Sequence, residues 1–272
     1  MIPKTIHFCW FGGKELPDLA IRCISSWRKF MPEYRIIQWS EQEGGKSENA
    51  LVDEVRQFDI SMSSFTEEAY RQKKYAFVSD YARLWVIYRY GGLYFDTDVE
   101  MIRPLDDIAG RGNFMGFEVD PDGENTPGRY APKYCFAVNL GLGFGMTPGH
   151  EFMKKLLKHY DTLTFDGAEM SPWLKTIVAH TTELLCMEGL ESRRGIQRVG
   201  DITVYPHEYF APINVITGRL KITENTYTIH RYMGSWDSGK TGGRTLKERI
   251  RSVIPEWLFI INNRIKRRRY RI

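Results

Sequence analysis

The stretch YGGLYFDTD, residues 90–98, holds the pattern that decides the fold. Apolar residues at helical spacing predict a helix over 73–90, and the glycine pair after it is typical of a left-handed helix end. Residues 93–95 then predict a short apolar strand that leads into Asp96 and Asp98. A turn at the end of that strand can bring both carboxylates to one ligand, and hard oxygen ligands of this kind suit Mg²⁺ or Mn²⁺. A solvated acidic loop is the alternative interpretation of the pair.

Strands and helices alternate on both sides of this stretch. Strands are predicted at 4–10, 34–39, 113–119, 135–146 and 202–205. Helices are predicted at 18–30, 149–160 and 172–188 and, from a cap at Ser47, over the apolar stripe Leu51, Val52, Val55 and Phe58. The alternation favours an α/β fold with a mostly parallel sheet that is covered by helices on both faces. Ligands of such sheets bind beyond the carboxyl ends of the strands.

The composition indicates one large globular domain followed by a basic segment. The 272 residues carry a formal net charge of +4, with +8 on residues 244–272 and −4 on residues 1–243. A disordered, collagen-like or coiled-coil chain is excluded by this composition. No apolar run is long enough to cross a bilayer, and the N-terminus lacks a secretion signal. The four scattered cysteines are expected to be free thiols in a reducing cytoplasm.

Asp80 and Arg83 lie three residues apart on the predicted helix and therefore share one face. They could form an ordinary intrahelical ion pair, which contributes little to stability. They could instead present a carboxylate and a guanidinium to a polyhydroxyl ligand, since the arginine fork binds two oxygens at once. Spacing alone leaves both interpretations open.

Two further residues are candidates for ligand contacts. His230 ends a predicted strand near a glycine turn, and beside Asp98 it would complete a mixed nitrogen and oxygen site that tolerates Mn²⁺. Trp10, just before Gly12-Gly13, could stack on a planar base. A structural histidine and a core tryptophan are the alternatives.

Together these segments resemble one known family, the glycosyltransferases with the DXD sugar-binding motif, or family 32. Its members occur in bacterial capsule and surface-polysaccharide clusters and in the Golgi of yeast and animals. The resemblance rests on four segments in the family's order: IPKTIHFCWFGG at 2–13, SDYAR at 79–83, YGGLYFDTD at 90–98 and HRYMGSW at 230–236. It is close over residues 1–106. It implies a GT-A catalytic domain, which we place at 1–243.

The resemblance also implies roles for individual residues. The donor is expected to be a UDP-sugar, with galactose first and glucose or an N-acetylhexosamine next, and transfer is expected to retain the anomeric configuration. The expected catalytic and binding residues, with their implied roles, are Trp10 on the base, Asp80 and Arg83 on the sugar hydroxyls, Asp96 on ribose or sugar, Asp98 and His230 on Mn²⁺ or Mg²⁺, and Ser235 and Trp236 on the diphosphate. Asn139 matches an asparagine on the acceptor side of relatives, whereas Met170-Ser171-Pro172 stands where they often carry Thr-Gly-Pro.

The chemistry requires that the charge on the departing diphosphate be neutralised, which a bound cation does. The sequence points to no convincing nucleophilic carboxylate on the opposite face of the sugar. We therefore expect substitution on one face, in which a diphosphate oxygen accepts the acceptor's proton.

The segment 244–272 combines a basic cluster at 266–269 with the apolar run 257–261. We expect a basic amphipathic helical tail that binds an anionic membrane surface, where each cation contributes on the order of 1 kcal/mol. A helix packed on the body is the alternative, and nucleic acid is disfavoured because the body is acidic. The enzyme is then expected in the cytoplasm, peripheral on the inner face of the cell membrane, with a saccharide acceptor linked to polyprenyl diphosphate in capsular polysaccharide biosynthesis.

Two other functions fit parts of the sequence. A magnesium-dependent phosphohydrolase of the haloacid dehalogenase type also places Asp-x-Asp after an apolar strand, but it carries Thr or Val where this chain has Glu100. A carbohydrate-binding protein without activity would keep the same binding motifs.

Overall fold

The computed structural model describes residues 1–42, 44, 49–121, 136–165, 176–214 and 217–233. Its strands are β1 (Thr5–Cys9), β2 (Arg35–Ser40), β3 (Glu54–Gln57), β4 (Gly92–Tyr94), β5 (Val99–Met101), β6 (Phe114–Val119), β7 (Ala137–Val138), β8 (Phe144–Met146), β9 (Gln197–Val199), β10 (Ile202–Tyr205) and β11 (Thr228–His230). Its helices are α1 (Asp18–Phe30), the short 3₁₀ helix η1 (Ile60–Met62), α2 (Ser64–Arg71), α3 (Tyr75–Tyr90), α4 (Asp106–Ala109), α5 (Glu151–Tyr160), α6 (Ile177–Met187) and α7 (His207–Phe210).

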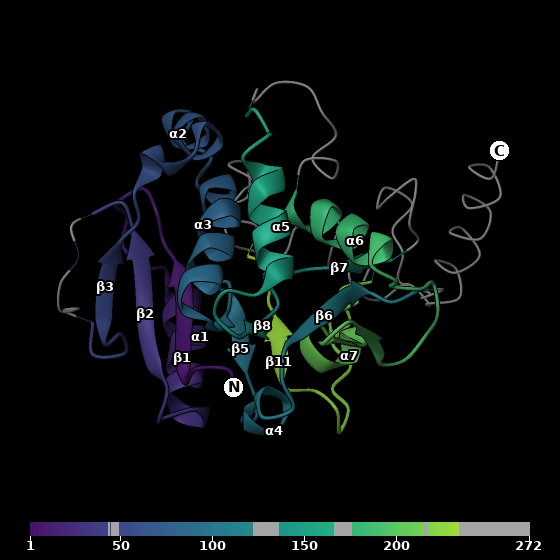
Figure 1. Ribbon diagram of the computed structural model, residues 1–272. Coiled ribbons are helices and arrows are strands. Elements are labelled where there is room, and N and C mark those ends of the chain that lie inside the picture. Colours follow the sequence, from purple (N-terminus) through teal and green to yellow (C-terminus); the bar gives the residue numbers. More distant parts are fainter. Residues whose placement is uncertain (43, 45–48, 122–135, 166–175, 215–216, 234–272) are drawn as a thin grey trace.

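One large sheet organises the molecule, with the strand order β3-β2-β1-β4-β8-β6-β10-β9 and with β7 paired to β6 (Figure 1). Strands β3, β2, β1 and β4 are parallel neighbours, as are β6 and β10. Strand β8 is antiparallel to both β4 and β6, so these two strands point the same way. The carboxyl ends of β1, β4, β6 and β10 therefore meet at one edge, where α/β sheets bind ligands.

Helices cover both faces of this sheet, and alternate residues of each strand supply two separate cores. On one face Ile6 and Phe8 of β1 pack with α1, through residues such as Trp27. On the other face Cys9 packs with α3 and α5. The predicted α/β class is confirmed, and the helix-flanked sheet is the arrangement expected of a GT-A fold.

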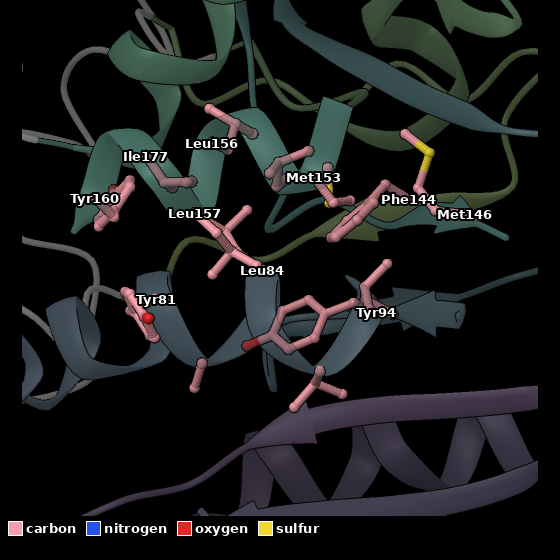
Figure 2. Close-up of a cluster of buried hydrophobic side chains, with 14 of the residues drawn as sticks. Tyr81, Leu84, Tyr94, Phe144, Met146, Met153, Leu156, Leu157, Tyr160 and Ile177 are labelled. Carbon is pink, nitrogen blue, oxygen red and sulfur yellow. The ribbon is translucent and has the colours of Figure 1, made fainter. Parts of the chain in front are cut away.

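The core between α3 and α5 fixes the helix that carries two of the candidate residues. Figure 2 shows Tyr81 and Leu84 of α3 on the side toward Leu157 and Tyr160 of α5. All four side chains are buried, and the hydroxyl of Tyr81 also donates to Asp161, 2.9 Å away. Because the outer side of α3 is held in this way, its remaining side is directed toward the sheet and the site.

The turn from α3 into β4 depends on the two glycines predicted to end the helix. Gly91 and Gly92 have φ angles of +63° and +99°, which side-chain-bearing residues rarely adopt. A Cβ on Gly92 would also lie 2.7 Å from the carbonyl oxygen of Thr5 in β1. The glycine pair thus lets β4 pair directly with β1 and carries the chain into Asp96.

Several predicted elements match closely, among them α1 over 18–30, α3, α5 and β10. The helix predicted over Leu51 to Phe58 is wrong, because residues 54–57 form β3, which pairs in parallel with β2. Its apolar residues do not form one stripe: Val52 and Phe58 are buried in the two different cores. The Asp53 carboxylate also accepts from the amide of Ile36 at 2.7 Å and so ties this segment to β2.

The strand predicted over 135–146 is also wrong in part, since it divides into β7 and β8 with a turn between them. The Asn139 side chain accepts from the amide of Gly141 at 2.7 Å, and Gly143 has a φ angle of +121°. A side chain that bonds to its own backbone favours a turn over a strand. This turn enters the site described below.

The helix predicted at 172–188 is present as α6, and residues 172–175 lie outside the described part of the chain. The tail predicted at 244–272 lies outside it as well, so its boundary stays a prediction. Within the described ranges, no helix has the length and apolar character needed to span a membrane.

His7 of β1 makes the stability of the fold depend on pH. Its ring is buried, its Nδ1 accepts from Trp39 Nε1 at 3.1 Å, and burial lowers its pKa from 6.5 to about 3. Below pH 6.5 the unfolded chain therefore binds this proton while the folded chain does not. We expect the free energy of unfolding to fall by about 2 kcal/mol between pH 6.5 and pH 5.

Urea unfolding at several pH values measures this loss. The variant His7→Gln removes the titrating group, so its stability should change less over the same range. Equal slopes for the wild type and the variant would contradict the assignment.

Candidate cation and sugar site

A two-stranded ribbon brings together residues that are far apart in the sequence. Strand β11 pairs antiparallel with β5, so that Thr228 lies opposite Met101 and His230 lies opposite Val99. Because Asp98 immediately precedes β5, the pairing places its side chain beside the imidazole of His230. The two segments predicted to share a ligand therefore do meet.

Asp98 has three contacts with the last residue of β11 and with the residues that follow it. Its carboxylate Oδ1 lies 3.2 Å from His230 Nε2, and its Oδ2 accepts from the amide of Met233 at 2.7 Å. The amide of Arg231 donates to its carbonyl oxygen at 2.9 Å. Burial opposes ionisation of this carboxyl, but His230 and the backbone donor hold its pKa below the usual value. Burial likewise disfavours the imidazolium, yet the nearby carboxylates raise the pKa of His230 to about 9.

Asp96 occupies the other side of the same turn. Its carboxylate lies 3.2 Å from Arg83 Nη2, and the same nitrogen lies 3.0 Å from Asp80 Oδ1. Its backbone amide donates to the carbonyl of Gly141 at 3.0 Å. A Cβ on Gly141 would lie 2.0 Å from Asp96 Oδ2, so only glycine leaves room for the carboxylate there. The Asn139–Gly141 turn thus sets the position of Asp96.

Arg83 is a buried guanidinium shared by two carboxylates. Its Nε donates to the Ser79 carbonyl at 3.2 Å, and its guanidinium lies 5.0 Å from the centre of the Tyr94 ring. Among the described residues its Nη1 has no hydrogen-bond partner. Burial opposes the charge, but Asp96 and Asp80 keep the pKa of Arg83 above its usual value.

Asp80 contacts the same guanidinium and also accepts a hydrogen bond from the N-terminus of a helix. Its carboxyl accepts from the backbone amide of Ile177, the first residue of α6. Burial nevertheless raises its pKa to about 7, against the pull of Arg83. One arginine therefore faces two carboxyl groups, which offer more hydrogen-bond acceptors than this single cation fills.

The donor set of this site fits a divalent cation. Asp96, Asp98 and His230 each offer a ligand atom within 4.8 Å of the others. Two carboxylates and an imidazole suit Mn²⁺ and tolerate Mg²⁺. His230 Nδ1 is buried and has no hydrogen-bond partner in the described part of the chain. A ligating imidazole must be neutral, so a cation would take the place of the proton on His230.

The structure places most of the predicted site residues together. Asp80, Arg83, Asp96, Asp98 and His230 form one contiguous group. The ion pair between Asp80 and Arg83 exists and also reaches Asp96 of the Asp-x-Asp turn, while their contact with a polyhydroxyl ligand stays a prediction.

Two further predicted residues lie near this group. Trp10 directly follows β1, at the sheet edge where Asp96 follows the adjacent strand β4. It is partly buried, and its Nε1 donates to the Lys14 carbonyl at 2.6 Å. Asn139 is buried in the turn against Asp96. The roles of Trp10 on a base and of Asn139 at an acceptor stay predictions.

Ser235 and Trp236, as well as Met170, Ser171 and Pro172, lie outside the described residues. Within the described part, the sequence analysis missed Glu118, a buried carboxylate near His230 and Asp96. The signal was present, because Glu118 is the acidic residue in the apolar strand FMGFEV. Glu100, by contrast, pairs with Arg231 at 2.7 Å and takes no part in the group.

The fold and site define an α/β protein in which three possible cation ligands lie beside a buried arginine shared by two carboxyl groups. Residues 17–115 match the model of the family described as the glycosyltransferase sugar-binding region containing DXD motif. This match includes Asp80, Arg83, Asp96 and Asp98 and ends before His230. The resemblance drawn from the sequence is confirmed at this level, while the family number stays a prediction.

Curated relatives are similar to this chain over parts of their length. It is 28% identical over 119 residues to subversion of eukaryotic traffic protein A of Legionella pneumophila, covering 39% of this chain and 18% of that protein. It is 25% identical over 139 residues to inositol phosphoceramide mannosyltransferase 1 of Schizosaccharomyces pombe, covering 50% and 40%. Among solved structures, the PaToxG glycosyltransferase has a TM-score of 0.46 at 20% identity and covers 69% of this chain and 70% of its own. The matched segments thus span less than half the length of these curated relatives.

If the Asp-Asp-His group binds the cation, removal of Asp98 should remove binding. We expect Asp98→Ala to weaken Mn²⁺ binding by more than roughly 10-fold, a loss typical of disturbing even the outer partners of a metal site. Titration of the protein with Mn²⁺ alone, with the free ion followed by its electron paramagnetic resonance signal, measures this. Glu100→Ala is the matched control, since it removes a neighbouring carboxylate that pairs with Arg231, and it should keep most of the affinity. Equal losses in both variants would contradict the site.

Proposed function

We propose that this chain is a metal-dependent, retaining hexosyltransferase that transfers a hexose from a nucleoside-diphosphate sugar to a saccharide acceptor. The observation that carries the proposal is the buried contact between Asp98 and His230, beside the bridge that Arg83 forms to Asp80 and Asp96. A cation position next to acceptors for hydroxyl groups matches the two halves of such a donor, a diphosphate and a sugar.

The residues of the group divide between these halves. Asp98 and His230 would hold Mn²⁺ or Mg²⁺, with Asp96 near enough to assist. When bound, the cation supplies neutralisation of the negative charge on the departing diphosphate. Arg83 offers its Nη1 donor, and the carboxyl groups of Asp80 and Asp96 offer acceptors to the sugar hydroxyls.

The flanking residues complete the proposed donor site. Trp10 stacks on the base from the end of β1, and Ser235 and Trp236 close over the diphosphate. Asn139 lies on the side from which the acceptor approaches.

Retention follows in this proposal from substitution on one face of the sugar. The bond between the anomeric carbon and the diphosphate oxygen breaks, and its electron pair goes to the diphosphate. The acceptor oxygen forms the new bond from the same face, and its proton passes to a diphosphate oxygen. A hexosyl adduct on the protein, detected by intact-mass measurement with a slow 2-deoxy-2-fluoro donor, would contradict this route.

The identity of the donor hexose is part of the proposal. UDP-galactose is the expectation from the sequence, followed by UDP-glucose and a UDP-N-acetylhexosamine. GDP-mannose joins them because two relatives are named as inositol phosphoceramide mannosyltransferases. Their names also support a lipid-linked acceptor, which for this chain we propose to be a saccharide on polyprenyl diphosphate in surface or capsular polysaccharide synthesis.

A donor screen tests the transferase function. With Mn²⁺ present, we expect one of UDP-galactose, UDP-glucose, UDP-N-acetylglucosamine or GDP-mannose to be hydrolysed slowly to free sugar and nucleoside diphosphate. Chromatography of the products separates the functions, since a phosphohydrolase that cleaves the phosphoanhydride would release nucleoside monophosphate and sugar 1-phosphate, and a binding protein would release nothing. The variant Asp98→Ala should lose the activity, and Glu100→Ala should keep it. Release of nucleoside monophosphate and sugar 1-phosphate from any of these donors would contradict the proposal.

The proposed position of the enzyme is the cytoplasmic face of the cell membrane, bound through the basic segment 244–272. We expect the full chain to sediment with vesicles that contain anionic lipid and to be released by salt, because basic residues are attracted to anionic lipid within a Debye length. A chain that ends at Gly243 should stay in solution. Sedimentation of the shortened chain equal to that of the full chain would contradict the role of this segment.

A further inference from the structure

Glu118 lies where β6 departs from regular pairing. Phe117 is paired with Val138 of β7, but Val119 is paired with Ala137, so Glu118 is the extra residue of a bulge. Bulges redirect a side chain and are frequent next to active sites. Glu118 is only 6% exposed although it carries a carboxyl group.

The bulge directs this carboxyl toward the cation and sugar site. The side chains of Asn139 and Tyr232 lie beside it, and His230 and Asp96 are the charged groups that act on its pKa. The Asn139 side-chain oxygen already accepts from Gly141. Its amide nitrogen is therefore the atom that faces Glu118. Asn139 thus links Glu118 to the turn that also positions Asp96.

Glu118 lacks a cation of its own among the described residues. Arg83 is shared by Asp80 and Asp96, and His230 faces Asp98. Burial accordingly raises the pKa of Glu118. A buried carboxyl group that neutral donors satisfy only in part is costly, and its two oxygens can accept about four hydrogen bonds. Further donors from a ligand would compensate this cost.

The order of strands at the sheet edge indicates which part of a donor lies there. Trp10 follows β1, the Asp96–Asp98 turn follows β4, and Glu118 lies near the end of β6, with β8 between the last two. If the base lies at β1 and the diphosphate at the cation, the sugar extends toward β6. Glu118 is also absent from the three-residue group that could hold the cation in the described part of the chain.

We propose that Glu118 is a further binding residue for the donor hexose, whose carboxyl group accepts from sugar hydroxyls while Asn139 holds it in place. This inference rests on the proposed function and adds to it a residue that selects the sugar.

The test compares donors that have the sugar with nucleotides that lack it. Binding of UDP-galactose, UDP-glucose, UDP-N-acetylglucosamine and GDP-mannose, and of UDP and GDP, is measured by calorimetry with Mn²⁺. We expect Glu118→Gln to weaken the donor that the wild type binds by roughly 10-fold or more, as for a lost hydrogen bond to a charged group. It should change the affinity for the matching nucleoside diphosphate less than about 2-fold. Glu100→Gln is the matched control and should leave both affinities unchanged.

Monodeoxy forms of the same donor locate the contact. The form that lacks the contacted hydroxyl should bind Glu118→Gln and the wild type equally, whereas the other forms should keep the difference. Equal weakening of the donor and of the nucleoside diphosphate would overturn the proposal, because Glu118 would then act on the cation or the fold.

Glu118→Asp, which keeps the charge and shortens the side chain, is measured in parallel. If both variants fail to fold, Glu118 is structural and the proposal is overturned. A wild type that binds none of these nucleotides would instead overturn the proposed function itself.

Discussion

The antiparallel pairing of β5 with β11 is the constraint on which the site depends, since it sets His230 opposite Val99 and next to Asp98. Strand pairing fixes such a juxtaposition to within a residue, because a shift by one would turn the histidine to the other face. The segment after β11 then closes on Asp98 with two backbone amides, those of Arg231 and Met233. The cation position is therefore built from backbone geometry as much as from side-chain chemistry.

Charge explains why this position suits a cation. Four carboxyl groups lie close together, and Arg83 and His230 are the basic groups among them. In a buried place such an excess of acid is unfavourable unless protons or a metal ion compensate it. Burial raises the pKa of Glu118, and the surrounding carboxylates raise the pKa of His230 against the effect of burial.

Much of this arrangement could be predicted from the sequence, and the physical reason is locality. The helix, the glycine pair, the strand and the Asp-x-Asp turn are neighbours in the chain, and local propensities placed them correctly. The approach of His230 to Asp98 was predicted from family resemblance, since no local pattern specifies which strand pairs with β5. Glu118 was missed although it is the acidic residue of an apolar strand, because the bulge at its position arises from strand pairing and cannot be seen in the sequence. Strand β3 was mistaken for a helix for a related reason, as the apolar residues that flank it, Val52 and Phe58, are buried in two different cores.

Gly141 restricts which substitutions such a protein can accept during evolution. Leu140 and Leu142, on either side of it, are buried in opposite cores, while its own missing side chain is the space that Asp96 occupies. Position 141 therefore tolerates no substitution without a shift of the motif. A lineage that adapts to a new sugar is thus constrained to keep glycine at the centre of this turn.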